Sequence, residues 1–154
     1  MNWNEANSIC SALGMRLPTE AEFEYAARGK SGKDKFATST GQLKDAQGKL
    51  LARYFGRDTG NVKEFSPNSY GLYGLSGNVW KWVSDWYGPY SSEAVTNPQG
   101  PMSGIRKVMR GELSYTIDMY VTTVIRDFHV PAVIRNSEDP SVRDDKLGFR
   151  CVAP

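Results

Sequence analysis

Hydrophobic residues recur at helical spacing in two stretches near the start of the chain. The first stretch, residues 4–13, is followed by Gly14, a common helix stop. Its apolar positions are Ala6, Ile9, Cys10 and Leu13. In the second stretch, residues 19–27, Thr19 can cap the helix and Glu22 completes a capping box three positions later. The pattern therefore predicts two helices in the first 27 residues.

Several short later stretches are predicted as strands, and residues 120–125 favour a strand most because they are rich in β-branched residues. The strands predicted in this way span residues 106–110, 120–125, 130–134 and 147–152, and residues 50–55 form a shorter candidate. Residues 30–45 lack periodicity and predict a surface loop, and residues 136–140 predict a turn. Fifteen glycines and eight prolines further favour a loop-rich fold over a helical bundle.

Residues 71–87 hold the densest group of large apolar side chains. Three of the four tryptophans, Trp80, Trp82 and Trp86, lie here. Aromatic side chains bury the largest areas, so this stretch is predicted to form the centre of the core. Glycines at every third position from residue 71 to residue 77 precede it, which is typical of a tightly turning backbone.

Length and charge narrow the class of protein. A chain of 154 residues fits one domain, and we expect a single domain over residues 1–154. A net charge of +2 without a basic run gives no support for nucleic acid as a partner. No apolar stretch has the length of a membrane span, and the first residues do not resemble a signal peptide, so the compartment is left open.

The second predicted helix carries three alternating acids, Glu20, Glu22 and Glu24. Paired carboxylates can serve acid–base catalysis, but acids in a first helical turn also favour the positive end of the helix dipole. We expect these three to face solvent.

Three motifs resemble those of the formylglycine-generating enzyme (sulfatase-modifying factor) family. They are residues 16–29 (RLPTEAEFEYAARG), residues 71–87 (GLYGLSGNVWKWVSDWY) and residues 147–152 (LGFRCV). The resemblance implies a C-type-lectin-like α+β fold, with two helices on a small twisted antiparallel sheet and much irregular chain. It begins within the family domain, so the family's N-terminal part is expected to be missing.

The resemblance has three consequences for site chemistry. Cys10 and Cys151 match a family disulfide, whereas spacing alone would equally allow two buried thiols. Family members oxidise a target cysteine with copper held by two cysteines, and this chain has no cysteine between residues 10 and 151. Gly74 and Lys81 replace two calcium ligands, so Lys81 is either a fixed cation in place of the ion or a solvated residue. No metal or cofactor is expected.

What remains is a binding surface over residues 112–136, helped by residues 87–90. Its candidate ligand-binding residues are Tyr115, Asp118, Tyr120, Thr122, Arg126, Asp127, Phe128 and His129. Tyrosine, arginine and histidine combine contact area with directional polar groups. Alternatively, the polar members could be loop residues without a partner. The residues assigned to structure are Trp80, Trp82, Trp86, Asp85 and Arg150.

We therefore predict a non-catalytic domain that recognises a protein or another macromolecule. It could be a hypervariable display protein, because part of the family is diversified by retroelements. The alternatives are an enzyme of the family with altered chemistry and a structural component of a surface or secretion apparatus.

Overall fold

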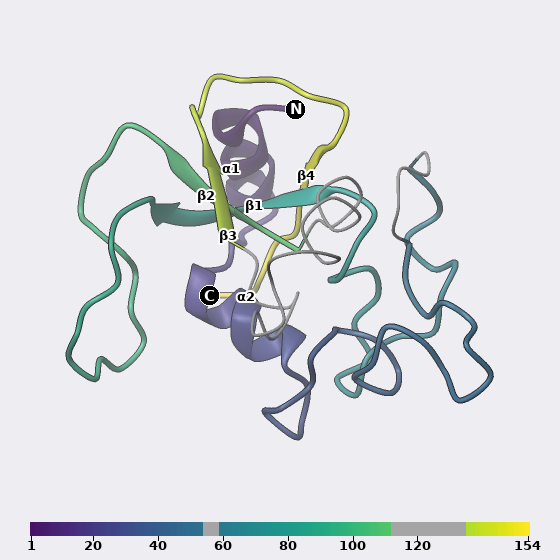
Figure 1. The fold of residues 1–154 in the computed structure, drawn as a ribbon. Helices are drawn as coiled ribbons and strands as arrows, with labels where there is room; N and C mark the ends of the chain where they lie inside the picture. The colour runs from purple at the N-terminus through teal and green to yellow at the C-terminus, as the bar shows by residue number, and fades with distance from the viewer. Residues whose placement is uncertain (54–58, 112–134) are drawn as a thin grey trace, which may run out of the picture. The chain divides into compact units, whose positions relative to one another are not determined.

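A computed structural model describes residues 1–53, 59–111 and 135–154 (Figure 1). The chain divides into two compact units. The first unit comprises Met1–Glu24, Trp80–Arg110 and Arg135–Pro154, and the second comprises Tyr25–Val79 and Gly111–Ile134. The single domain over residues 1–154 stays a prediction.

Both helices lie where the apolar spacing predicts them. Helix α1 spans Trp3–Ala12, one residue earlier than predicted, because Asn2 caps it and forms a capping box with Glu5. Helix α2 spans Glu20–Ala27, and the Thr19 hydroxyl accepts a hydrogen bond from the Glu22 backbone N–H at 3.1 Å. Capping side chains therefore determine where both helices begin.

The first unit contains a four-stranded mixed sheet in the order β3-β2-β1-β4. The strands are β1 (Trp80–Trp86), β2 (Lys107–Arg110), β3 (Arg135–Glu138) and β4 (Leu147–Phe149). Strands β1–β2 and β2–β3 pair antiparallel, whereas β1–β4 pair parallel. The α+β class is confirmed. The sheet differs from the antiparallel expectation because the connection after β3 crosses to the opposite edge, so β4 runs in the direction of β1 (Figure 1).

Local sequence signals were misleading at two places in this part of the chain. The predicted turn over residues 136–140 is wrong for its first half, because Asn136, Ser137 and Glu138 belong to β3. Pairing with β2 outweighs the weak strand propensity of these polar residues. Leu50 forms only an isolated bridge with Lys44, so the described part of residues 50–55 is not a strand. The predicted strands at residues 120–125 and 130–134 lie outside the described residues.

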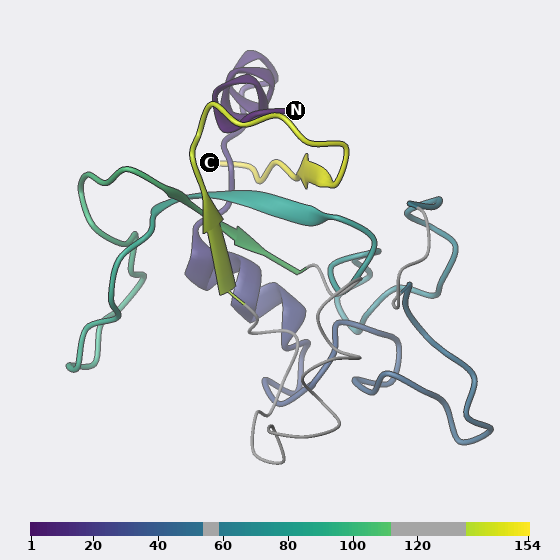
Figure 2. The same ribbon diagram turned by 45° about the horizontal axis from the view of Figure 1, so that its top comes forward.

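The core of the first unit forms around Trp82, which is completely buried on β1. Its buried neighbours are Ala6, Cys10, Leu17, Met109 and Leu147. Helix α1 packs against β1 (Figure 2). Two indole N–H groups have backbone acceptors: that of Trp3 donates to the Val83 carbonyl at 2.7 Å, and that of Trp82 donates to the Met1 carbonyl at 3.4 Å. The tryptophan-rich stretch therefore forms the core, as predicted.

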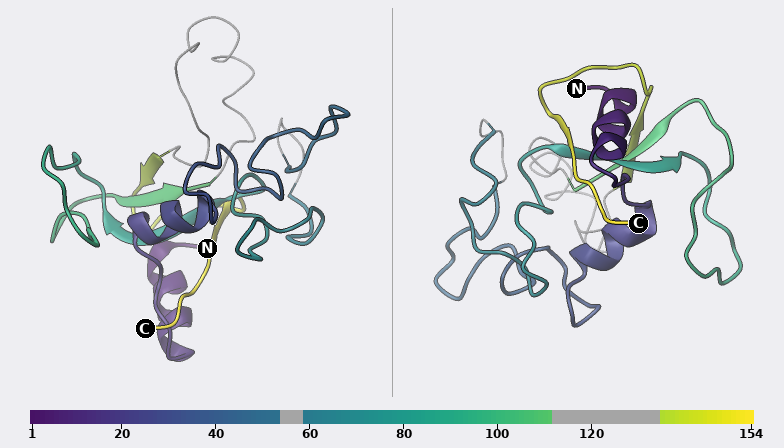
Figure 3. Two further views of the ribbon diagram at one scale, coloured as in Figure 1. Left: turned by 90° about the horizontal axis from the view of Figure 1, so that it is seen from below. Right: turned by 180° about the vertical axis from the view of Figure 1, so that it is seen from behind.

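A long connection joins β1 to β2 within the first unit. It spans residues 87–106 and extends away from the sheet as a loop (Figure 3). Tyr87 and Tyr90, at its beginning, expose 47% and 66% of their surface. This segment brings two exposed aromatic rings to the end of β1.

After the end of α2, the described part of the second unit is irregular chain around a glycine turn. Asn68 holds the turn, because its side chain donates to the Ala26 carbonyl and accepts from the N–H groups of Tyr70 and Leu72. Further along, the Gly77 N–H donates to the Gly111 carbonyl at 2.7 Å. The Asn68 side-chain amide thus satisfies backbone groups of the turn that have no strand partner.

Candidate functional site

The candidate ligand-binding residues form a single segment between two adjacent strands. Tyr115, Asp118, Tyr120, Thr122, Arg126, Asp127, Phe128 and His129 all lie outside the described residues. The two ends of their segment are described. Arg110 is the last residue of β2 and Arg135 the first residue of β3, and the two face each other as a register pair. The segment therefore leaves and re-enters the sheet at one position.

One carboxylate contacts both of these arginines. The Nε atom of Arg135 donates to both Glu20 carboxylate oxygens, at 2.8 and 3.0 Å, and Arg110 Nη1 lies 3.4 Å from Glu20 Oε1. Arg110 Nη2 also donates to Glu24 at 2.7 Å. The Arg110 side chain is completely buried and that of Glu20 is 8% exposed. The expectation that Glu20 faces solvent is wrong, because its carboxylate pairs with the buried Arg110 and with Arg135. Glu24 also pairs with Arg110 but stays 27% exposed, and Glu22 is 43% exposed.

Two tyrosines complete this cluster. The Arg135 guanidinium lies 4.4 Å from the ring centres of both Tyr87 and Tyr90, and its Nη1 donates to the Gly88 carbonyl at 2.7 Å. The Tyr90 hydroxyl donates to Glu20 at 2.8 Å. Burial, the hydrogen bond to Glu20 and its negative charge raise the pKa of Tyr90 to about 12, so the hydroxyl remains a donor at neutral pH. We call Glu20, Arg110, Arg135, Tyr87 and Tyr90 the Glu20 cluster.

A second group of charges lies beside the first, at the end of β1. Asp85 accepts from the Glu20 backbone N–H at 2.7 Å and from the Ser84 hydroxyl at 3.1 Å, although burial raises the pKa of its carboxyl group. Lys107 places its ammonium 4.0 Å from the Trp3 ring centre and 3.8 Å from the Trp86 ring centre. Burial lowers the Lys107 pKa to about 8, while the Asp85 charge opposes that shift.

The chain offers no thiol for copper chemistry. Its two cysteines, Cys10 and Cys151, are joined in a disulfide that ties α1 to the chain after β4. A disulfide sulfur does not supply the thiolate that monovalent copper prefers. The residues present therefore do not fit the copper site that the family implies. Among the described residues, no group of three or more histidine, cysteine, aspartate or glutamate side chains is arranged to hold a metal.

The calcium-ligand position on β1 also carries different chemistry. Lys81 is only 5% exposed, opposite Arg110 on β2 and Gly148 on β4. The alternative of a solvated lysine is wrong, because the residue is buried. A fixed cation in place of calcium stays a prediction. Arg150 is partly buried, and burial lowers its pKa.

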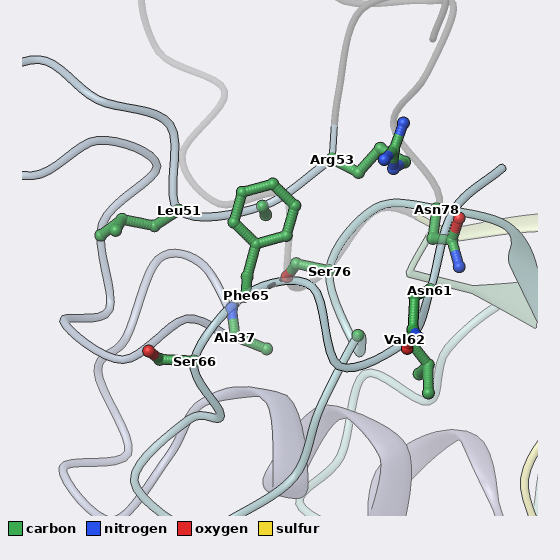
Figure 4. Close-up of a pocket in the computed structure, with 11 residues that line it drawn as sticks. Ala37, Leu51, Arg53, Asn61, Val62, Phe65, Ser66, Ser76 and Asn78 are labelled. Atoms are coloured by element: carbon green, nitrogen blue, oxygen red, sulfur yellow. Dashed lines mark hydrogen bonds between the residues drawn. The ribbon is translucent and has the colours of Figure 1, made fainter. Parts of the chain in front are cut away.

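The second unit contains a small pocket that sequence patterns do not indicate. Its volume is about 20 Å³, enough for roughly one water molecule. The residues labelled around it include Phe65, Ser76 and Asn78 (Figure 4). The Asn78 amide donates to and accepts from the Gly60 backbone, at 3.2 and 2.9 Å. The Asn78 side chain thus links its own turn to the chain at Gly60. The pocket volume is too small for an organic ligand.

None of the helices in the described part of the chain is both long enough and apolar enough to cross a bilayer.

Comparison with known proteins identifies the scaffold. The Sulfatase-modifying factor enzyme 1-like domain matches residues 1–154. The formylglycine-generating enzyme of Streptomyces coelicolor is 36% identical over 98% of this chain and 50% of its own length. The inactive C-alpha-formylglycine-generating enzyme 2 of Bos taurus is 32% identical over 99% of this chain and 48% of its own length. The chain thus spans about half the length of these relatives.

Among solved structures, the Treponema denticola variable protein 1 superposes with a TM-score of 0.67 at 34% identity. The superposition covers 88% of this chain and 46% of that protein. The family resemblance of the three sequence motifs is confirmed. The chain belongs to the sulfatase-modifying factor enzyme 1-like domain family.

Proposed function

We propose that this chain is a non-catalytic recognition domain that binds a protein or another macromolecule through residues 112–136. The observation that carries the proposal is the use of both cysteines in one disulfide. The family oxidation needs a thiolate pair after the arginine–glycine turn, and here residues 112–134 contain no cysteine. The scaffold keeps its fold but lacks the groups that would activate oxygen.

The attachment of the segment supports a binding role. The residues that border positions 111–134, Arg110 and Arg135, form one register pair on β2 and β3. A connection between paired strands is a common place for recognition, because its sequence can change while the strands stay constant. The similarity to a variable protein of Treponema denticola and to an inactive formylglycine-generating enzyme of Bos taurus points the same way.

The composition of the segment suits a macromolecular ligand. It offers Tyr115, Tyr120 and Phe128 as rigid aromatic groups, with Arg126 and Asp127 as charged groups between them. Aromatic and arginine side chains contribute most of the binding energy at protein interfaces. Tyr87 and Tyr90 would extend this surface from the neighbouring connection, since both rings are exposed.

An oxidase assay tests the non-catalytic part of the proposal. The purified chain is loaded with monovalent copper and given a cysteine-containing peptide in an oxygen electrode. We expect no oxygen consumption above that of copper in buffer, while the Streptomyces coelicolor enzyme serves as the positive control. Conversion of the peptide cysteine to formylglycine would refute the proposal.

A capture experiment tests the recognition surface. Proteins from the source organism are captured on the wild-type chain, on a triple variant (Tyr115→Ala, Tyr120→Ala, Phe128→Ala) and on Tyr25→Ala, which removes an exposed tyrosine of α2. We expect a partner that the wild type and Tyr25→Ala retain and the triple variant loses. A partner retained equally by all three would place recognition elsewhere.

Gene sequences separate a display protein from a fixed structural component. For a display protein, the flanking DNA should encode a reverse transcriptase and contain a near-copy of the coding stretch for residues 112–136. Variation between gene copies should then concentrate at residues 115–130. Identical copies with one constant partner would instead favour the structural component.

A further inference from the structure

Glu20 contacts both arginines that border residues 111–134, which we call the recognition segment. Arg110 immediately precedes residues 111–134, and Arg135 immediately follows them. Glu20 is the carboxylate that both arginines share, at 3.4 Å from Arg110 and 2.8 Å from Arg135. Two backbone positions separated by 25 residues in sequence are thus connected through one side chain.

Burial makes this connection strong. The side chains of Arg110, Glu20 and Arg135 are 0%, 8% and 15% exposed. Paired charges that are shielded from water are expensive to separate, because removing one partner leaves the other without compensation. Glu24 also pairs with Arg110 at 2.7 Å. Loss of Glu20 would remove the carboxylate that pairs with both arginines.

Glu20 is itself held in place from both directions. Its backbone N–H donates to Asp85 on β1, which anchors the first residue of α2 to the sheet. Its carboxylate also accepts from the Tyr90 hydroxyl, while the rings of Tyr87 and Tyr90 contact the Arg135 guanidinium. The carboxylate therefore has little freedom to move away from the two arginines.

We propose that Glu20 is a positioning residue for recognition: by pairing with Arg110 and Arg135 it fixes both ends of the segment, independently of the sequence between them. The inference rests on the proposed function and specifies how the scaffold would serve it. A fixed pair of end points is a form of preorganisation, which lowers the free-energy cost of binding. It also allows the sequence of residues 112–134 to change without disturbing β2 and β3.

The matched variants are Glu20→Gln and Glu22→Gln. Both remove one negative charge from the first turn of α2, but Glu22 pairs with Arg16 at the surface and has no contact with either segment end among the described interactions. Amide hydrogen exchange without ligand is measured by mass spectrometry. We expect Glu20→Gln to accelerate exchange at least tenfold in residues 107–110 and 135–138, with α1 and β4 unchanged. Glu22→Gln should leave β2 and β3 as in the wild type.

Unchanged exchange of β2 and β3 in Glu20→Gln, or an equal increase throughout the chain, would overturn the proposal. If Glu20→Gln does not fold, Tyr90→Phe decides, since it removes one hydrogen bond to Glu20 from an exposed ring. It should accelerate exchange in residues 135–138 and not in α1. No change there would also overturn the proposal.

A binding measurement separates the positioning role from the proposed function. Residues 115–130 are randomised in the wild-type and Glu20→Gln scaffolds, and both libraries are selected against hen egg-white lysozyme. Affinities are then measured on folded protein. We expect wild-type binders, with at least tenfold weaker affinity after Glu20→Gln is introduced into them. Unchanged affinity would overturn the positioning role. Absence of binders from both libraries would count against the proposed function, while hydrogen exchange would still decide the role of Glu20.

Discussion

At the scale of single residues, two glycines share the same backbone conformation but have different surroundings. Gly71 and Gly77 both have φ of +81°, in the left-handed region that side chains disfavour. A Cβ atom added at Gly71 would meet nothing within 4 Å, whereas one at Gly77 would lie 2.2 Å from the Arg53 carbonyl oxygen. Substitution of Gly71 therefore tests backbone strain alone, whereas substitution of Gly77 tests backbone strain together with a steric clash.

We predict that Gly71→Ala lowers the free energy of unfolding by about 1–2 kcal/mol, the cost of the left-handed conformation. Gly77→Ala should cost about 4 kcal/mol or more, because backbone must also move. Urea unfolding followed by tryptophan fluorescence measures both. Equal losses would show that the Arg53 carbonyl yields easily and that the contact is unimportant.

Lys107 is a buried cation whose protonation should affect stability. Its pKa is lowered to about 8 by burial, from an ordinary value near 10.4 in the unfolded chain. The unfolded state therefore binds more protons between these values, so stability from this group increases as pH rises through that window. Below about pH 8 the full penalty for the buried charge is present.

We predict that the wild type gains stability relative to Lys107→Met between pH 8 and pH 10, since methionine keeps the apolar stem without titrating. Urea unfolding of both proteins at pH 7, 8, 9 and 10 provides the measurement. Parallel pH profiles would mean that Trp3 and Trp86 stabilise the ammonium enough to cancel the effect of burial.

At the scale of elements, the start of α2 depends on Glu22. Its carboxylate accepts from the Thr19 backbone N–H at 2.8 Å and pairs with Arg16. The hydrogen bond from Arg16, followed by that from Thr19, lowers the pKa of Glu22 to about 2. This contribution is present above the ordinary glutamate pKa near 4.3 and is lost as pH falls toward 2.

We predict that Glu22→Gln costs less than about 1 kcal/mol at pH 7, because the side chain is 43% exposed and solvent screens the pair. The difference from the wild type should shrink as pH is lowered from 5 to 3. Thermal unfolding by circular dichroism measures it, with Thr19→Ala as the variant that removes the other half of the capping box. A difference that is constant with pH would contradict an electrostatic origin.

At the scale of the whole molecule, the disulfide joins positions 141 residues apart. Closing so long a loop removes much of the conformational freedom of the unfolded chain, worth about 5 kcal/mol in the loop-entropy estimate. Cys10 is completely buried in the core beside Trp82. The bridge thus closes almost the entire sequence around the core of the first unit.

We predict that the Cys10→Ala, Cys151→Ala double variant loses about 3–5 kcal/mol of unfolding free energy. Dithiothreitol should lower the melting temperature of the wild type and leave that of the double variant unchanged. Calorimetry with and without reductant tests this. A wild-type melting temperature that is insensitive to complete reduction, verified by thiol titration, would contradict the prediction.

The sequence predicts the parts of this fold that depend on neighbouring residues. Apolar spacing and the Thr19–Glu22 capping box place both helices within one residue, and the tryptophan stretch predicts the centre of the core, although not that it is a strand. These features arise from local backbone preferences and from burial of large side chains, which a linear pattern records. The resemblance of the three motifs to a known family adds the α+β fold class, which residue spacing alone does not give.

Sequence reasoning failed where a distant partner decides the outcome. Residues 136–138 are polar and turn-like, yet they form β3 because β2 supplies hydrogen bonds. Glu20 reads as a solvent-facing acid, yet it is buried against Arg110 and Arg135. The Glu20 cluster was missed for the same reason, although the arginines that border the cysteine-free segment were a possible signal.

Composition and order of residues determined by themselves that this chain begins with two helices, has an aromatic core and has no cysteine between residues 10 and 151. Those properties follow from residue identity and short-range spacing. Only the tertiary structure decided that β4 runs parallel to β1, that Cys10 bonds Cys151, and that Glu20 connects Arg110 with Arg135. Each of these depends on which distant segments become neighbours, and buried charges and sulfur atoms acquire their roles only from those neighbours.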